Sequence, residues 1–187
     1  MSVDPQGWHG GAARMESPNS DARPIGTVID LLVLHSISLP PGQYGGPAVP
    51  NLFTNRLDWD ADPHFRDLRG LRVSAHFLVR RDGGLVQFVS CNERAWHAGV
   101  SHFEGRAACN DFSIGVELEG LDSTPFMPIQ YAVLIRLTEA LIARYPLVAV
   151  AAHSEIAPGR KTDPGPGFVW SEFLGASRLP LRRIHGA

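Results

Sequence analysis

The sequence has little cysteine, no long apolar run and no excess of positive charge. Its two cysteines, Cys91 and Cys109, exclude a disulfide framework and any Cys-x-x-Cys metal or redox motif. No apolar stretch approaches the roughly 20 residues that cross a bilayer. A net charge of −2 gives no electrostatic basis for binding nucleic acid or an anionic membrane. These absences favour a soluble globular protein with neither nucleic acid nor membrane as a partner.

Residues 1–24 lack the basic cluster and apolar core of a secretory signal. They are rich in glycine, proline, serine and charge, which predicts an arm with little regular structure. Without such a signal, and with two thiols expected to be reduced, we expect a cytoplasmic protein. The alternative is a periplasmic form whose signal has been removed. The length and the hydrophobic content of 44% fit one domain over residues 1–187, and we expect a monomer.

Strand-like segments outnumber helical ones in the rest of the chain. An apolar run at residues 28–36 predicts a central strand covered on both faces. Two further runs flank Arg-Asp-Gly-Gly at residues 81–84, which favours a tight hairpin turn. Apolar residues at helical spacing predict a helix over residues 128–146, with proline at both ends. The remaining predictions are strands at residues 111–120 and 147–154 and a turn-rich loop at residues 38–51. The predicted fold class is therefore α/β (α+β mixed), with a central mixed β-sheet flanked by helices.

Three side chains could form a metal site. His35 ends the first apolar strand, His153 ends the last one, and Asp163 lies in a turn-rich segment at residues 153–167. Strand ends hold side chains rigidly at a cleft, and a catalytic zinc site needs three protein ligands and one open position. In the alternative interpretation each histidine caps its strand by bonding to backbone. No compact His-Glu-x-x-His motif decides between the two.

Two carboxylates lie in the predicted strand at residues 111–120. Because side chains alternate along a strand, Glu117 and Glu119 share one face with Ser113 and Gly115. Two carboxylates on one face could act as acid and base in a glycosidase. The alternative is that they form the solvent-facing side of the strand.

Other polar residues carry weaker signals. His76 lies within a predicted strand, which favours a core group whose hydrogen bonds are satisfied. His64 and His97 lie in loops, where functional side chains concentrate. Glu155 and Arg160 are interpreted as solvated loop charges.

Four segments in order resemble one family: "LLVLHSISLPPGQYGGP", "LRVSAHFLVRRDGGLVQFV" with "RAWHAGVS", "CNDFSIGVELEG" and "HSEIAPGRKTDPGPGF". The family is that of the AmpD-type 1,6-anhydro-N-acetylmuramoyl-L-alanine amidases of bacterial cell-wall recycling. The resemblance extends from about Gly7 to about Phe173. It implies the zinc amidase fold shared with phage lysozyme-type amidases and peptidoglycan recognition proteins. It also implies cleavage of the amide between the lactyl group of N-acetylmuramic acid and L-alanine of the stem peptide.

The resemblance further implies roles for individual residues. The family's metal ligands fall on His35, His153 and Asp163, which implies one Zn²⁺ per chain. The acidic catalytic residue falls on Glu117, and the family's lysine, which would stabilise charge on the carbonyl oxygen, falls on Lys161.

The implied partner is an anhydromuropeptide. Arg72 matches a family arginine suited to bidentate binding of a stem-peptide carboxylate. Trp96 could pack against sugar or peptide, and the alternative is a role in the core. His64 stands where an aromatic residue, often tyrosine, would line the site.

The sequence also departs from the family pattern. Ser36 follows the first histidine, where asparagine is frequent. Ala108 replaces an arginine that usually precedes the cysteine of "CNDF", and Arg106 is the residue that could compensate.

A non-catalytic peptidoglycan-binding module of the same fold is the alternative function. Such a module could dispense with a third metal ligand and a catalytic acid. The presence of Asp163, Glu117 and Lys161 together favours the enzyme.

Overall fold

The computed structural model describes residues 2–177 and 179–183, in which seven strands form one mixed sheet. The strand order is β1-β5-β4-β9-β3-β10-β11, and β4 and β5 are the antiparallel neighbours in it. Two short antiparallel pairs, β2 with β6 and β7 with β8, lie outside this sheet. The strands are β1 (Ala13–Arg14), β2 (Ser20–Ala22), β3 (Leu31–Ile37), β4 (Phe77–Val79), β5 (Leu85–Gln87), β6 (Glu93–Ala95), β7 (His102–Phe103), β8 (Arg106–Ala107), β9 (Ser113–Glu119), β10 (Ala149–Ala152) and β11 (Arg182–Arg183).

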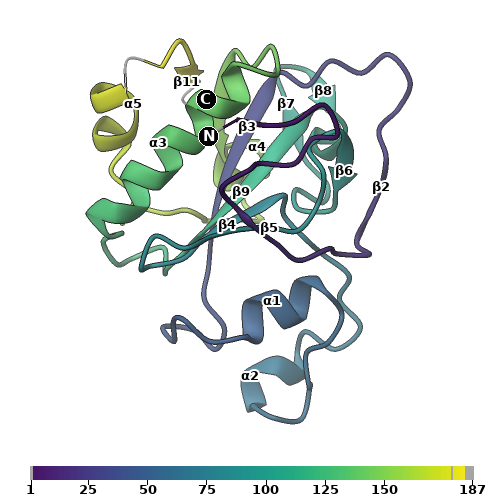
Figure 1. Cartoon of the computed structure of the whole chain (residues 1–187). Coiled ribbons are helices and arrows are strands. Elements are labelled where there is room, and N and C mark those ends of the chain that lie inside the picture. Colours follow the sequence, from purple (N-terminus) through teal and green to yellow (C-terminus); the bar gives the residue numbers. More distant parts are fainter. Residues whose placement is uncertain (1, 178, 184–187) are drawn as a thin grey trace.

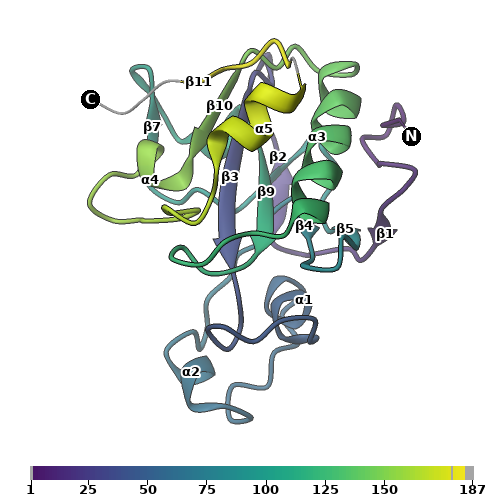
Figure 2. The ribbon, with the colours of Figure 1, turned by 90° about the vertical axis from the view of Figure 1, so that its left-hand side faces the viewer.

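Helices cover the sheet unevenly. Helices α3 and α5 contact each other and lie together on one face of the sheet, whereas α1 and α2 lie beyond the end of β3 (Figures 1 and 2). None of the described helices is long and apolar enough to cross a membrane. The helices are α1 (Ala48–Phe53), α2 (Pro63–Arg66), α3 (Pro128–Ile142), α4 (His153–Ile156) and α5 (Trp170–Ser177), with a 3₁₀ turn at Cys109–Asp111.

Both faces of the central strand β3 are buried, as the sequence predicted. Leu32 and Leu34 pack on one face in a cluster that includes Leu134 of α3. Leu31 and Val33 point the other way, into a second cluster covered by the loops around β7 and β8. Burial of each such side chain contributes roughly 1.5–3 kcal/mol, which makes this part of the sheet a rigid base for the residues that follow it.

The N-terminal arm is more ordered than its composition predicted. It contributes β1 to the sheet edge, parallel to β5, and β2 to the pair with β6. Burial lowers the pKa of Arg23 to about 10, so its guanidinium is still charged at neutral pH. This guanidinium fastens the arm by donating hydrogen bonds to the main-chain oxygens of Cys91, Asn110, Asp111 and Ser113.

The predicted hairpin and the predicted long helix are both confirmed, although the helix ends at Ile142 rather than at Pro146. Part of the predicted loop at residues 38–51 is helical, because α1 begins at Ala48. His153 is the first residue of α4 rather than the last of a strand. Helix α5 and strand β11 had no predicted counterpart.

Candidate functional site

Strand register brings three of the predicted site residues to one edge of the sheet. β9, β3 and β10 are parallel neighbours, so their carboxyl ends lie together. His35 in β3 is directly opposite Glu117 in β9. Leu34 is opposite Ala152, so His153, the next residue, stands beside His35. The carboxyl edge of parallel strands is where open α/β sheets place their ligand sites.

Asp163 reaches the same edge from a loop that hydrogen bonds hold in position. The backbone N–H of Ser154 donates to the carbonyl oxygen of Asp163 at 3.0 Å. The hydroxyl groups of Ser36 and Thr162 donate to the two carboxylate oxygens of Asp122. A Cβ on Gly165 would lie 2.4 Å from that of Asp122, so only glycine permits this close approach.

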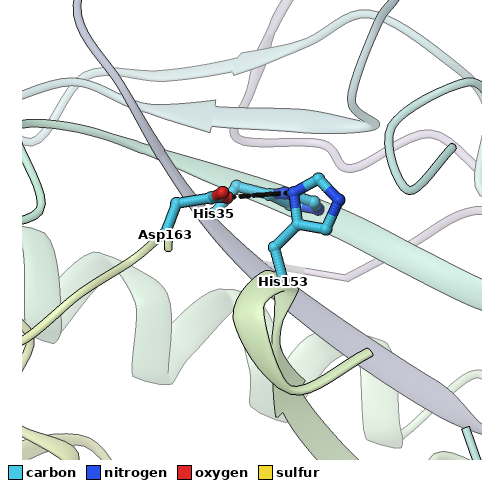
Figure 3. A group of neighbouring side chains, drawn as sticks. All are labelled: His35, His153 and Asp163. Atoms are coloured by element: carbon cyan, nitrogen blue, oxygen red, sulfur yellow. Dashed lines mark hydrogen bonds and ion pairs between the residues drawn. The ribbon is translucent and has the colours of Figure 1, made fainter. Parts of the chain in front are cut away.

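His35, His153 and Asp163 converge through single atoms, as Figure 3 shows. The two Nδ1 atoms are 2.9 Å apart, and each lies 3.1 Å from Oδ2 of Asp163. Both imidazoles are buried, and complete burial lowers the pKa of His35 to about 4, which favours the neutral, metal-binding ring. Two imidazole nitrogens and one carboxylate oxygen form a donor set that suits zinc and other divalent transition ions.

Glu117 is buried beside this group, so the solvent-facing interpretation was wrong. Its Oε2 atom is buried and has no hydrogen-bond partner among the described residues. Burial, together with the negative charge of Asp163, raises the pKa of Glu117 well above its usual range. Glu119 is also buried, but its two oxygens accept the backbone N–H groups of Gly45 and Arg81. Glu119 is therefore part of the scaffold, and the two carboxylates do not form an acid–base pair.

A cavity of about 520 Å³ opens over the group. Lys161, Arg72 and Trp96 line it, as do Glu117 and the three converging residues. The side-chain amine of Lys161 has no hydrogen-bond or ion-pair partner within residues 2–177 and 179–183. Its charge opposes the rise in the pKa of Glu117, so the two groups interact. An apolar wall of the cavity includes Leu39, Leu52, Phe53, Leu68, Leu71 and Val73.

Two predicted substrate contacts lie elsewhere. The side chain of His64 is 61% exposed on α2 and bonds to Asp62 at 2.8 Å, away from the cavity lining. Arg106 pairs with Asp30 and lies over the ring of Phe112. The structure therefore does not bring Arg106 to the cavity to compensate for the arginine that the sequence lacks.

Two charges interpreted as solvated are engaged in the structure. Glu155 accepts the backbone N–H of Ala152 at 2.7 Å and pairs with Arg183. Arg160 donates to the carbonyl oxygens of Ala98 and Val100 and lines the cavity. The prediction of a satisfied core histidine is confirmed for His76, which is fully buried and bonded to backbone.

His97 is the principal residue whose position the sequence did not predict beyond a place in a loop. Its Nδ1 atom lies 2.9 Å from Nε2 of His35, directly behind the converging group. One signal for this position was Gly115, because glycine inside a strand frequently marks the close approach of another group. A Cβ there would lie 2.5 Å from the ring of His97.

Comparison with known proteins supports one family. Residues 25–166 match the family described as N-acetylmuramoyl-L-alanine amidase. The 1,6-anhydro-N-acetylmuramyl-L-alanine amidase AmpD of Escherichia coli K12 is 54% identical over 170 residues, which cover 90% of this chain and 93% of the relative. A crystal structure of an AmpD derivative superposes with a TM-score of 0.91 at 51% identity, covering 94% of this chain and 98% of that one.

A more distant solved structure contains a ligand. It is the complex of the amidase AmiD from E. coli with anhydro-N-acetylmuramic acid-L-Ala-D-γ-Glu-L-Lys, described as its substrate. The TM-score is 0.57 at 34% identity, and the match covers 82% of this chain and 60% of that one.

We predict that the metal-free protein binds about one equivalent of Zn²⁺, and that His153→Ala abolishes this binding because it removes one of three ligands. Isothermal titration calorimetry on chelator-treated protein measures both. His102→Ala is the matched control, since His102 is exposed on β7. Equal zinc affinity in His153→Ala and the wild type would exclude the proposed ligand set.

Proposed function

Because the chain belongs to the N-acetylmuramoyl-L-alanine amidase family, we propose that it hydrolyses the amide between the lactyl group of 1,6-anhydro-N-acetylmuramic acid and L-alanine of the stem peptide. The proposed biological setting is peptidoglycan recycling. The observation that carries the proposal is that one cavity is lined both by a metal-binding group and by Glu117, whose Oε2 atom has no partner among the described residues.

We propose Zn²⁺ as the ion held by His35, His153 and Asp163. Two imidazole nitrogens and one carboxylate oxygen fit zinc by donor type. When bound, zinc would supply a Lewis acid for the carbonyl and lower the pKa of an adjacent water toward neutrality.

Glu117 is the proposed general base and then the general acid. Its free Oε2 can take one proton from the attacking water, while the water oxygen forms a bond to the lactyl carbonyl carbon. The same oxygen then gives the proton to the nitrogen of L-alanine as the C–N bond breaks. The products are the free stem peptide and the lactyl carboxylic acid, which loses the second water proton to solvent and becomes a carboxylate. The raised pKa of Glu117 suits this exchange near neutral pH, and a nearby cation moves that pKa downward so that the base form is accessible.

Lys161 is the proposed stabiliser of the developing oxyanion. Lys161 lines the cavity and its ammonium has no partner in the described part of the chain, so it can approach the carbonyl oxygen as negative charge accumulates there. Loss of one such stabiliser typically lowers the rate roughly a hundred- to a thousand-fold.

Substrate binding is proposed for the remaining lining residues. The guanidinium of Arg72 can hold a stem-peptide carboxylate through two parallel hydrogen bonds. Trp96 and the apolar wall offer flat surface to the sugar ring.

We also propose that the protein acts as a cytoplasmic monomer. Its two thiols, Cys91 and Cys109, are buried and unpaired. Light scattering of the purified protein and fractionation of the host cells are the measurements that decide these two points.

We predict that the wild type releases free stem peptide from anhydromuropeptide, that a chelator stops the release, and that added zinc restores it. Glu117→Gln keeps the shape of the side chain but accepts no proton, so kcat should fall by roughly 10²–10⁴-fold. Mass spectrometry of the products is the measurement, and Glu139→Gln on the exposed side of α3 is the matched control.

Two outcomes of this assay would contradict the proposal. Binding of muropeptide without release of peptide would indicate a non-catalytic module. Cleavage between sugars that persists in chelator would indicate a glycosidase. Parallel use of intact sacculi would show whether the anhydro sugar is required.

For Arg72→Met we predict a higher KM with little change in kcat, since the lost contact is to a part of the substrate remote from the reacting amide. A charge-assisted hydrogen bond contributes about 1.5–3 kcal/mol, which corresponds to a rise in KM of roughly 10- to 100-fold. Steady-state kinetics measures it. Arg69→Met serves as control, because Arg69 is exposed and pairs with Asp60. Equal KM values for the two variants would remove Arg72 from the binding surface.

A further inference from the structure

A line of polar atoms runs from the converging group back into the sheet. Nε2 of His35 lies 2.9 Å from Nδ1 of His97. Nε2 of His97 lies 3.2 Å from the hydroxyl of Ser113, and that hydroxyl lies 2.5 Å from the carbonyl oxygen of Cys109. Three side chains and one backbone group thus form a continuous hydrogen-bonded chain.

The carbonyl at its end fixes the direction of every proton. A carbonyl oxygen only accepts, so the single hydroxyl proton of Ser113 is donated to Cys109. The Ser113 oxygen must therefore accept from His97, whose ring proton is then on Nε2. Nδ1 of a neutral His97 consequently has a free lone pair, and it accepts the Nε2 proton of His35.

The same logic applies to His153 by a shorter route. Its Nε2 atom lies 3.2 Å from the carbonyl oxygen of Ala98, so its ring proton is also on Nε2. Both metal-side nitrogens, the Nδ1 atoms of His35 and His153, are then unprotonated. They face each other and Asp163 as lone pairs, which is the form that a cation requires.

We propose that His97 is a positioning residue that accepts the Nε2 proton of His35 and thereby presents the Nδ1 lone pair of His35 to the metal. This inference rests on the metal site of the proposed function. His153 obtains its orientation from backbone, whereas His35 depends on a side chain for it. Substitution of His97 alone therefore tests this hydrogen-bonded chain.

A direct role of His97 in binding substrate fits the geometry less well. His97 lines the cavity, but its two ring nitrogens are engaged by His35 and Ser113. The ring packs closely against β9, because a Cβ at Gly115 would lie 2.6 Å from its Nδ1 atom. Gly115 thus provides the space that lets His97 stand behind His35.

The first test needs no variant and no substrate. Long-range ¹H–¹⁵N correlation spectra of the zinc-loaded wild type distinguish protonated from unprotonated ring nitrogens. We expect protonated Nε2 and unprotonated Nδ1 in His35, His97 and His153. A proton on Nδ1 of His35 would overturn the inference while leaving the amidase assay unaffected.

The second test compares two variants of nearly equal shape. In His97→Asn the side-chain oxygen can occupy the place of Nδ1 and accept from His35, whereas His97→Leu has no acceptor. Loss of such an outer-shell partner typically weakens metal affinity roughly 10- to 100-fold. We expect that loss for the leucine variant, and affinity within about threefold of the wild type for the asparagine variant, in chelator competition with Zn²⁺.

Thermal unfolding of both metal-free variants controls for the cavity that each substitution leaves. Because asparagine and leucine have the same number and branching of side-chain heavy atoms, a purely structural role predicts similar losses of zinc affinity in the two variants. Equal zinc affinities in the two variants would therefore overturn the inference, whether both match the wild type or both are weakened.

Discussion

The parallel register of β9, β3 and β10 is the constraint on which the site depends. It sets His35 opposite Glu117 and brings His153 alongside, because β3 pairs directly with both β9 and β10. The strands are buried on both faces, so a shift of one residue would turn polar groups into apolar clusters and is strongly disfavoured. The rigid placement of the ligands and the glutamate therefore follows from burial of the leucine and valine residues that precede them in the strands.

Burial also determines the electrostatics at this edge. Three electronegative atoms meet within 3.1 Å, and beside them one oxygen of Glu117 has no partner in the part of the chain that the structure describes. Such an arrangement is costly without a cation, because buried polar groups are normally paired. This unfavourable arrangement is confined to the proposed catalytic edge. Buried polar groups elsewhere form hydrogen bonds, as the side chains of Arg23 and Glu119 do.

Much of the architecture could be predicted from local pattern. The buried strand β3, the hairpin of β4 and β5, and the helix α3 follow from apolar periodicity and turn residues, which act over a few neighbours. The arm was predicted less well, because its order comes from strand pairing and from side chains such as Arg23 that bond to backbone about 70 to 90 residues away. Glu119 and Arg160 were misjudged for the same reason: a charged side chain in a sequence gives no sign of the distant backbone groups that bind it.

The sequence by itself determined the family, through collinear segments that carry His35, Glu117, His153, Lys161 and Asp163 in order. It also determined which face of β9 holds Glu117, since alternation along a strand is a local property. Only the tertiary structure decided that Arg72 reaches the cavity while His64 and Arg106 do not, and that His97 stands behind a metal ligand. These facts depend on which loops pack together, and packing between distant segments is set by the whole core rather than by any stretch of sequence.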